Sequence, residues 1–224
     1  MIDWGPIILT FQLAFVTTGI LLLIGIPLAY WLAYAKTRWR PVLETLVSMP
    51  LVLPPTVVGF YLLLAFSPSY GVGKVLEDWF GFRLAFSFSG LVVASVIYSL
   101  PFMVQPIQAG FRNLPTSLSE ASQMLGKSRL TTLFKVLLPN IKPSMLTGLV
   151  LSFAHTIGEF GVVLMIGGNI PDRTKVASIA IYDEVEAMNY AVANAYSLFL
   201  FVVTFLILLL VYVVNGGRLN RYAR

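Results

Sequence analysis

The stretch EASQMLGKSRLTTLFKVLLP, residues 120–139, is a mixed polar and apolar passage set between long apolar runs. Of the 224 residues, 58% are hydrophobic and only 11% are charged, an apolar share above that of soluble domains. This composition is typical of an integral membrane protein. The quoted stretch therefore marks a place where the chain leaves the membrane, and the runs on either side of it are expected to be crossing helices.

Runs free of charged side chains locate these helices, because a crossing helix needs roughly 20 apolar residues. Five runs exceed that length: 4–35, 45–73, 84–111, 143–171 with a single interruption at Glu159, and 187–217. The sequence shows no internal repeat and no soluble linker between them. We therefore predict an all-α, polytopic membrane protein of five transmembrane helices, forming one domain over residues 1–224 with its termini on opposite sides.

The basic residues are divided unevenly between the two sides of this arrangement. Eleven of the 15 follow the first, third and fifth runs: Lys36, Arg38, Arg40, Arg112, Lys127, Arg129, Lys135, Lys142, Arg218, Arg221 and Arg224. The other side holds Lys74, Arg83, Arg173 and Lys175, mixed with acidic residues. Because cytoplasmic loops carry the excess of Lys and Arg, the N-terminus is predicted outside, and the C-terminus and residues 120–139 in the cytoplasm. The charges follow membrane topology and indicate no nucleic-acid partner.

The spacing of apolar residues predicts two short amphipathic helices in this cytoplasmic stretch. The first follows Pro115 and ends at Gly126, a residue able to adopt a left-handed conformation; its apolar positions are Leu114, Leu118, Ala121 and Leu125. The second is capped by Ser128 and ends at Pro139 and Pro143; its apolar positions are Leu130, Leu133, Phe134 and Leu137. Periodicity alone leaves open whether the pair lies on lipid, on its own bundle or on a partner protein.

The same stretch resembles the EAA loop of ABC importer permeases, whose pattern is Glu-Ala-Ala, three residues, Gly, nine residues, Ile, one residue, Leu-Pro. Five residues match in register, namely Glu120, Ala121, Gly126, Leu138 and Pro139, while Ser122 replaces the second Ala and Val136 replaces Ile. The resemblance implies that residues 112–142 form a coupling loop that inserts into a cleft of a cytoplasmic ATPase. The implied coupling positions are Glu120, Ala121, Ser122, Gly126, Leu130, Leu133, Phe134, Leu138 and Pro139.

Three further stretches are similar to molybdate and tungstate permeases of this superfamily: MPLVLPPTVVGFYLLLAF, HTIGEFGVVLMIGGNIPDRT and ASIAIYDEVEAMNYAVANAYSL. Sulfate permeases share a similar Gly-Glu-Phe-Gly stretch, so sulfate stays an alternative to molybdate or tungstate. The resemblance implies a homodimer, a cytoplasmic ATPase dimer that binds ATP and Mg²⁺, an extracytoplasmic oxyanion-binding protein, and a bacterial or archaeal plasma membrane. No cofactor is expected in this chain, which has no phosphate-binding Gly-rich motif.

Prolines in the second run predict a helix break at membrane depth: Pro50, Pro54 and Pro55. If a helix restarts near Pro55, the amides of Thr56, Val57 and Val58 are expected to be free, and such a positive helix end attracts anions. This would place Pro54, Pro55 and Thr56 on the route of an oxyanion. A kink that serves packing alone is the alternative.

Glu159 is the acidic residue well inside a predicted span, with His155 one turn earlier. Ionisable groups within the membrane are candidates for function. A carboxylate would repel a doubly charged oxyanion, which favours a gate or a helix-packing contact over a substrate ligand. The alternative is structural, with Glu159 hydrogen-bonded to a neighbouring helix and His155 a neutral core residue. Gly158 and Gly161 suit a close approach of helices.

Other functional classes find less support in the sequence. An enzyme would need a nucleophile with a base or a metal cluster, but the chain has one His and no Cys. A secondary transporter often carries paired repeats and several intramembrane charges. A structural scaffold would not require the loop in register. On the outer side, the 167–175 loop with Arg173 and Lys175 is a candidate dock for the binding protein, with an ordinary solvated loop as the alternative.

Overall fold

The computed structural model describes residues 2–69 and 71–222, with side chains up to residue 213. The helices are α1 (Gly5–Tyr34), α2 (Arg40–Val52), α3 (Pro55–Phe66), α4 (Gly71–Phe80), α5 (Phe88–Arg112), α6 (Thr116–Met124), α7 (Arg129–Thr132), a π-helical turn (Leu133–Leu137), α8 (Leu138–Asn140), α9 (Lys142–Gly158), α10 (Gly161–Gly167), α11 (Ala177–Glu186) and α12 (Tyr190–Tyr222). In these two ranges the structure contains no strand, and the predicted all-α class is confirmed.

Four helical segments within the described residues are long and apolar enough to cross a membrane: Gly5–Tyr34, Pro55–Phe80, Phe88–Arg112 and Tyr190–Val213. A fifth is counted if Arg129–Asn140 and Lys142–Gly158, which meet at an angle of 77°, form one bent span. The predicted number of five is therefore the upper value that the structure allows.

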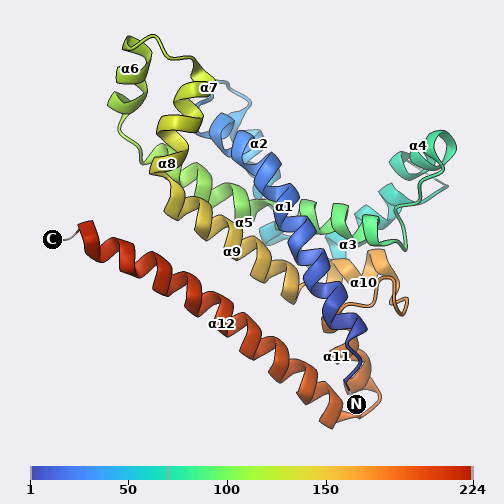
Figure 1. Ribbon diagram of the computed structural model, residues 1–224. Coiled ribbons are helices and arrows are strands. Elements are labelled where there is room, and N and C mark those ends of the chain that lie inside the picture. Colours follow the sequence, from blue (N-terminus) through green and yellow to red (C-terminus); the bar gives the residue numbers. More distant parts are fainter. Residues whose placement is uncertain (1, 70, 223–224) are drawn as a thin grey trace.

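The centre of the bundle is formed by α1, α5 and α9, which pack along one another (Figure 1). Leu21 and Leu32 of α1 are fully buried against Met103, Ile107 and Phe111 of α5. Small residues permit the close crossing, since a Cβ added at Gly25 would lie 2.8 Å from the Met103 side chain. The long α12 stands apart from this core and leaves most of its apolar surface exposed (Figure 1).

Two of the predicted spans are broken. The run 45–73 is divided where α2 ends at Val52 and α3 begins at Pro55, with Leu53 and Pro54 in extended conformations. Each of these two residues precedes a proline, which disfavours helical geometry. The predicted break is confirmed at this pair of prolines, whereas Pro50 lies inside α2 without ending it.

The second break was not predicted. The run 143–171 is divided into α9 and α10 at Glu159 and Phe160, where Glu159 has a ψ of 130°. The expectation that Glu159 lies within a continuous span is therefore wrong, because it lies at the end of α9. No proline marks this break, and its position follows from contacts with α3 and α11.

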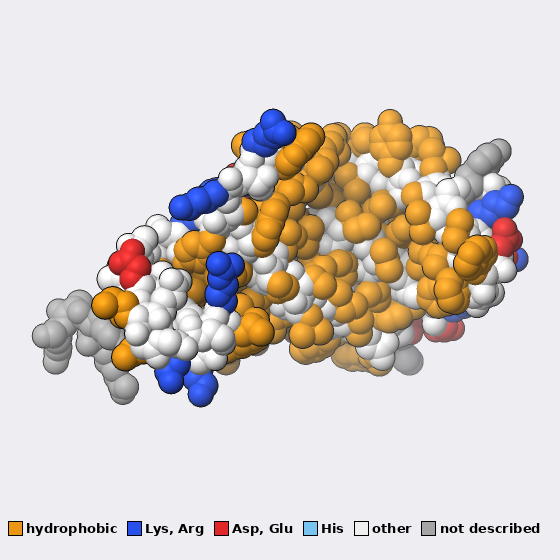
Figure 2. All heavy atoms as spheres, turned by 90° about the horizontal axis from the view of Figure 1, so that it is seen from above, with side chains coloured by type: hydrophobic (Ala, Val, Ile, Leu, Met, Phe, Trp, Pro, Cys, Tyr) orange, Lys and Arg blue, Asp and Glu red, His pale blue; other side chains and the backbone are white. Residues whose placement is uncertain are grey.

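Charged side chains gather at the two ends of the molecule, with a hydrophobic belt between them (Figure 2). One end holds α6, α7, the end of α5 and the beginning of α2; the other holds the beginning of α1 together with α4, α10 and α11 (Figure 1). The helix pair of the 112–142 loop and the outer 167–175 loop thus lie at opposite ends of the bundle.

Candidate functional site

The helix pair of the 112–142 loop is built as the sequence predicts. Gly126 has a φ of +68° and ends α6, with its amide donating to Gln123 O (2.8 Å) and the Lys127 amide donating to Ser122 O (3.1 Å). The Ser128 side chain then caps α7 by accepting from the Thr131 amide at 3.2 Å. The left-handed turn and the cap are confirmed.

A buried hydrogen bond locks the two helices of the pair together. Ser122 Oγ and Thr132 Oγ1 lie 2.8 Å apart, and both residues are buried. Thr132 donates its hydroxyl proton to Ser128 O at 3.0 Å, so the Ser122 hydroxyl donates to Thr132. The Ser that replaces Ala in the EAA pattern therefore has a structural role, which the sequence did not indicate because it depends on Thr132.

The surface of the loop differs in part from the predicted set of coupling residues. Four apolar side chains are strongly exposed at its tip: Met124, Leu125, Leu130 and Phe134. Glu120, Ala121, Gly126 and Pro139 are also exposed, and Leu138 is half-buried. Two predicted positions, however, do not belong to the exposed surface: Ser122 is only 6% exposed, and Leu133 is 8% exposed and packs into the core beside Leu137.

The second helix of the pair does not stop at Pro139. A π-helical turn at Leu133–Leu137 leads into α8, which contains Pro139 and continues to Asn140, and the chain then bends at Ile141 into α9. Proline is accepted there because it lies in the first turn of α8. The helix therefore ends at Asn140, between Pro139 and Pro143, the two prolines predicted to stop it. Single π-helical turns occur often at functional sites.

The two helix breaks meet at the side of the bundle, where Pro54, Pro55 and Thr56 are exposed. A Cβ placed on Gly161, at the start of α10, would lie 2.8 Å from Pro55 Cβ and 3.5 Å from the Thr56 amide nitrogen. Gly59 of α3 is in similar contact with Met165 of α10. Residues far apart in the sequence are thereby brought to one place, and the only residue type that fits at position 161 without displacement is glycine.

A cavity of about 490 Å³ opens at this meeting point. It is lined by Pro55, Thr56, Tyr98, Ala154, His155, Gly158, Glu159, Phe160, Gly161, Leu164 and Met165. The structure thus unites the predicted pathway residues Pro55, Thr56 and Glu159, while Pro54 lies just before them on the chain. The prediction that Val57 and Val58 have free amides is wrong, since both donate to Pro54 O, at 2.9 and 3.3 Å.

Glu159 contributes a buried carboxyl group to the cavity. The residue is 4% exposed, and within the described residues neither carboxyl oxygen has a hydrogen-bond partner. Its main-chain carbonyl is held by the Ser178 hydroxyl of α11 at 2.7 Å. Both oxygens are covered by protein, and the buried Ser95 of α5 lies beside the carboxyl group, so a packing contact with a neighbouring helix stays as open as a role in the gate.

His155 is held by aromatic stacking and a chain of hydroxyl groups. Its ring stacks on Phe102 at 4.0 Å, and Nδ1 lies 2.9 Å from Ser99 Oγ. Thr156 donates to Ser152 O at 2.9 Å, so it accepts from Ser99, which in turn accepts from His155 Nδ1. In the neutral ring Nε2 is then an acceptor. These contacts agree with the expected core histidine.

The 167–175 loop lies at one end of the bundle, and its two basic residues, Arg173 and Lys175, have different surroundings. Arg173 is exposed, whereas Lys175 is ion-paired with Asp183 of α11, its Nζ lying 2.6 Å from Oδ2. Thr174 is buried and fixes the loop by donating to Gly167 O at 2.7 Å. Arg173 is therefore the more accessible of the two candidate docking residues.

One polar cluster at the opposite end was missed by sequence reasoning. Glu44 Oε1 accepts from Arg40 Nε at 2.9 Å, from Gln108 Nε2 at 2.7 Å and from Arg112. The hydrogen bond from Arg40, with help from Gln108 and Arg112, holds the pKa of the Glu44 carboxyl below its ordinary value. The signal was present in the spacing of Arg40 and Glu44, four residues apart, and in the polar stripe that ends α5.

Comparison with known proteins places the chain among membrane transport components. It matches the family described as binding-protein-dependent transport system inner membrane component over residues 25–218. It is 45% identical over 210 residues to the molybdenum transport system permease protein ModB of Azotobacter vinelandii, covering 94% of this chain and 93% of that protein. The putative molybdenum transport system permease protein YvgM of Bacillus subtilis is 35% identical over 203 residues, covering 91% and 89%.

A more distant relative and a solved structure complete the comparison. A probable sulfate transport system permease protein of Marchantia polymorpha is 32% identical over 196 residues, covering 88% of this chain and 68% of that protein. The fold is similar to a chain of a bacterial alginate ABC transporter in complex with a periplasmic protein, with a TM-score of 0.70 and 24% identity, covering 92% and 77%. The chain therefore belongs to the family of binding-protein-dependent transport system inner membrane components and is a transport component, not an enzyme.

Proposed function

We propose that this chain is the permease subunit of an ATP-driven importer and forms the transmembrane route for an oxyanion, molybdate or tungstate. The observation that carries the proposal is the meeting of two helix breaks at one cavity, with the beginning of α3 facing it. A helix beginning at membrane depth is tolerated where it lines a cavity, and its positive end favours an anion. Higher identity to molybdenum permeases than to a sulfate permease favours molybdate over sulfate.

The partners follow from the coupling loop. The exposed apolar tip at Met124, Leu125, Leu130 and Phe134 is suited to insertion into a cleft of a cytoplasmic ATPase. One chain offers one such loop, so two ATPase subunits, which bind ATP and Mg²⁺, require a second copy of this chain. An extracytoplasmic binding protein delivers the anion at the other end, where Arg173 is exposed.

The orientation in the plasma membrane of a bacterium or archaeon follows from the charges. The end that carries α6 and α7 is rich in Lys and Arg and is assigned to the cytoplasm. The N-terminus then lies outside, and residues 1–224 act as one permease domain.

Pro54, Pro55 and Thr56 form the route, and Glu159 acts as part of the gate. The cavity brings the Glu159 carboxyl and the start of α3 to the same place, so an oxyanion that enters meets both. The carboxyl group is buried at the point that a passing anion would have to cross. Movement of the end of α9 relative to α3 would carry Glu159 away from the route and open it.

The function is tested by uptake of labelled molybdate, tungstate and sulfate into vesicles that contain this chain, its ATPase and its binding protein. We expect ATP-dependent accumulation of molybdate or tungstate, with sulfate much weaker. An ATPase variant that binds but does not hydrolyse ATP is the matched control and should abolish uptake. Accumulation driven by an ion gradient without ATP would contradict the proposal and indicate a secondary transporter.

A further inference from the structure

Glu44 joins the second broken span to the base of the coupling loop. It lies in the first turns of α2, and it accepts a hydrogen bond from Arg112, the last residue of α5. Residue 112 is also where the 112–142 loop begins. A single carboxylate thus connects the helix that leads to the Pro54 break with the residue from which the coupling loop starts.

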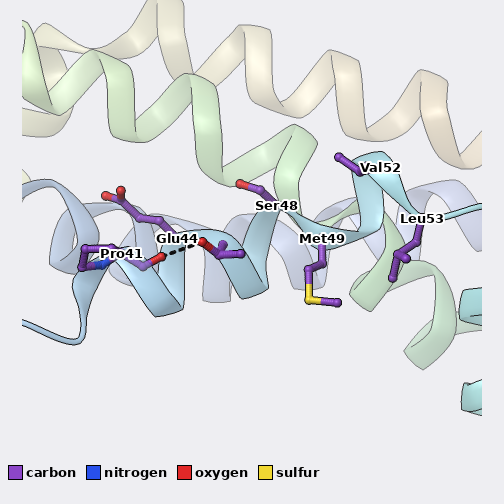
Figure 3. Close-up of a pocket in the computed structure, with 7 residues that line it drawn as sticks. Pro41, Glu44, Ser48, Met49, Val52 and Leu53 are labelled. Atoms are coloured by element: carbon purple, nitrogen blue, oxygen red, sulfur yellow. Dashed lines mark hydrogen bonds between the residues drawn. The ribbon is translucent and has the colours of Figure 1, made fainter.

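The contact between α2 and α5, here called the seam, is polar and consists of two sets of hydrogen bonds. Glu44 binds Gln108 and Arg112, and one turn further along α2 Ser48 Oγ accepts from Gln105 Nε2 at 3.1 Å. The side chains of Glu44 and Ser48 point toward α5, whereas Met49 points away from it (Figure 3). The three α5 residues are spaced three and four apart and therefore form one stripe on that helix.

Apolar packing holds α2 through few side chains, since only Leu43 and Val47 of this helix pack, half-buried, against the core residues of α1 and α5. Every residue of α2 is at least partly exposed, and its apolar side chains Val42, Leu46, Met49 and Val52 are each more than two-fifths exposed. Its main neighbour in the structure is α5. The polar seam therefore acts together with Leu43 and Val47 to fix α2 relative to the bundle.

Charge gives Glu44 a second role in the seam. The guanidinium groups of Arg40 and Arg112 both contact the same carboxylate oxygen, so they lie close to each other. Without the carboxylate these two positive charges would repel, and α2 would be pushed away from the end of α5. Removal of Glu44 is thus expected to open the seam and not merely to weaken it.

We propose that Glu44 is a positioning residue for transport: it clasps α2 to the end of α5, so that movement of the coupling loop is passed to the helix break at Pro54. The inference rests on the proposed function. When the loop moves with the ATPase, Arg112 moves with it, and the clasp carries α2 along. Because α2 ends directly before Leu53 and Pro54, this displacement reaches the cavity between α3 and α10.

The test compares Glu44→Ala with Glu77→Ala in the assembled transporter. Glu77 is a matched control because it also forms an ion pair, with its Oε1 2.5 Å from Arg83 Nε. Glu77 lies on α4 and Arg83 follows that helix, so this pair is at the opposite end of the bundle from the coupling loop. Glu44→Ala should still co-purify with the ATPase, but the ATP hydrolysed per oxyanion imported should rise about tenfold, since charge-assisted hydrogen bonds are lost. Glu77→Ala should leave this ratio unchanged.

A crosslink provides an independent arm that does not depend on the loss of a side chain. The chain has no native cysteine, so Ser48→Cys with Gln105→Cys can be joined by a short bifunctional thiol reagent cleaved by dithiothreitol. In the Glu44→Ala background the crosslink should restore a normal ratio, and dithiothreitol should remove the rescue. The same crosslink in the presence of Glu44 should leave transport intact.

If Glu44→Ala leaves the ATP hydrolysed per oxyanion imported unchanged, the proposal is overturned. This holds whether uptake and hydrolysis both stay normal or both fall in proportion. A crosslink that fails to rescue, or that blocks transport when Glu44 is present, would overturn it as well. Failure of the proposed function is recognised separately, because the unmodified transporter would then import no oxyanion.

Discussion

Gly161 is the residue at which the two broken spans touch. Its position against Pro55 leaves no room for a side chain, whereas Gly158, on the other side of Glu159, has open space around it. Two glycines three residues apart therefore have different roles, which spacing in the sequence does not reveal. The contact fixes where the start of α3 lies relative to Glu159, and so it sets the geometry of the proposed gate.

Gly161→Ala should push the beginning of α10 away from the beginning of α3. A methyl group 2.8 Å from Pro55 Cβ requires a backbone shift, and overpacking of this kind typically costs about 1–3 kcal/mol. We expect a lower thermal unfolding temperature in detergent and reduced uptake. Gly158→Ala, with no heavy atom within 4 Å of the added group, is the control and should be near normal. Equal behaviour of the two variants would show that the breaks are not in tight contact.

The helix pair of the 112–142 loop shows what a sequence can predict at the scale of elements. Its cap at Ser128 and its turn at Gly126 are local signals, and the structure contains both. The break at Glu159 and Phe160 carries no proline and depends on the contact of Gly161 with Pro55, about a hundred residues earlier in the chain. The π-helical turn and the Ser122–Thr132 hydrogen bond likewise depend on packing between elements.

The same limit applies to the candidate site. Ser122 and Leu133 are buried and so lie off the exposed part of the predicted coupling surface, Ser122 between the two helices of the pair and Leu133 against the core. The clustering of Thr56 and Glu159 around one cavity was not predictable from periodicity, since each break had to be placed in space first. What the sequence did provide was the identity of the residues at the first break and in the loop.

Gly126→Val should misdirect the second helix of the pair. A left-handed conformation costs a residue with a side chain roughly 1–2 kcal/mol, and a β-branched one more. The space around Gly126 is open, so backbone strain and not a clash is the cause. We expect co-purification of the ATPase and uptake to fall together. Gly126→Asn is the control, because Asn tolerates this conformation. Normal attachment and uptake in the Val variant would refute the docking assignment.

The whole molecule is polarised, with a basic end, a hydrophobic belt and an end of mixed charge (Figure 2). This polarity supports the proposal that the 112–142 loop is cytoplasmic and that the 167–175 loop lies outside. Since α12 leaves most of its apolar surface exposed and α2 is exposed along its length, the isolated chain presents large apolar surfaces. Lipid and a second copy of the chain are the occupants expected for them.

Single cysteines introduced into this cysteine-free chain test the orientation. Lys74→Cys and Arg173→Cys lie on exposed positions at the outer end, and Arg38→Cys and Lys127→Cys on exposed positions at the cytoplasmic end. A membrane-impermeant thiol reagent should label only the first two in intact cells and all four after permeabilisation. Labelling of positions 38 and 127 in intact cells would reverse the assigned topology.

The central claim is that the oxyanion passes the meeting point of the two helix breaks, and Thr56 is the residue that tests it most directly. In Thr56→Asp a carboxylate would stand at the cavity that the anion has to pass and would repel it. Co-purification with the ATPase should persist, because Thr56 and the coupling loop belong to different parts of the bundle, and Thr56→Ser should transport normally. The measurement is ATP-dependent molybdate uptake by Thr56→Asp: the account predicts that it is lost, and uptake at the normal rate by the assembled variant would contradict it.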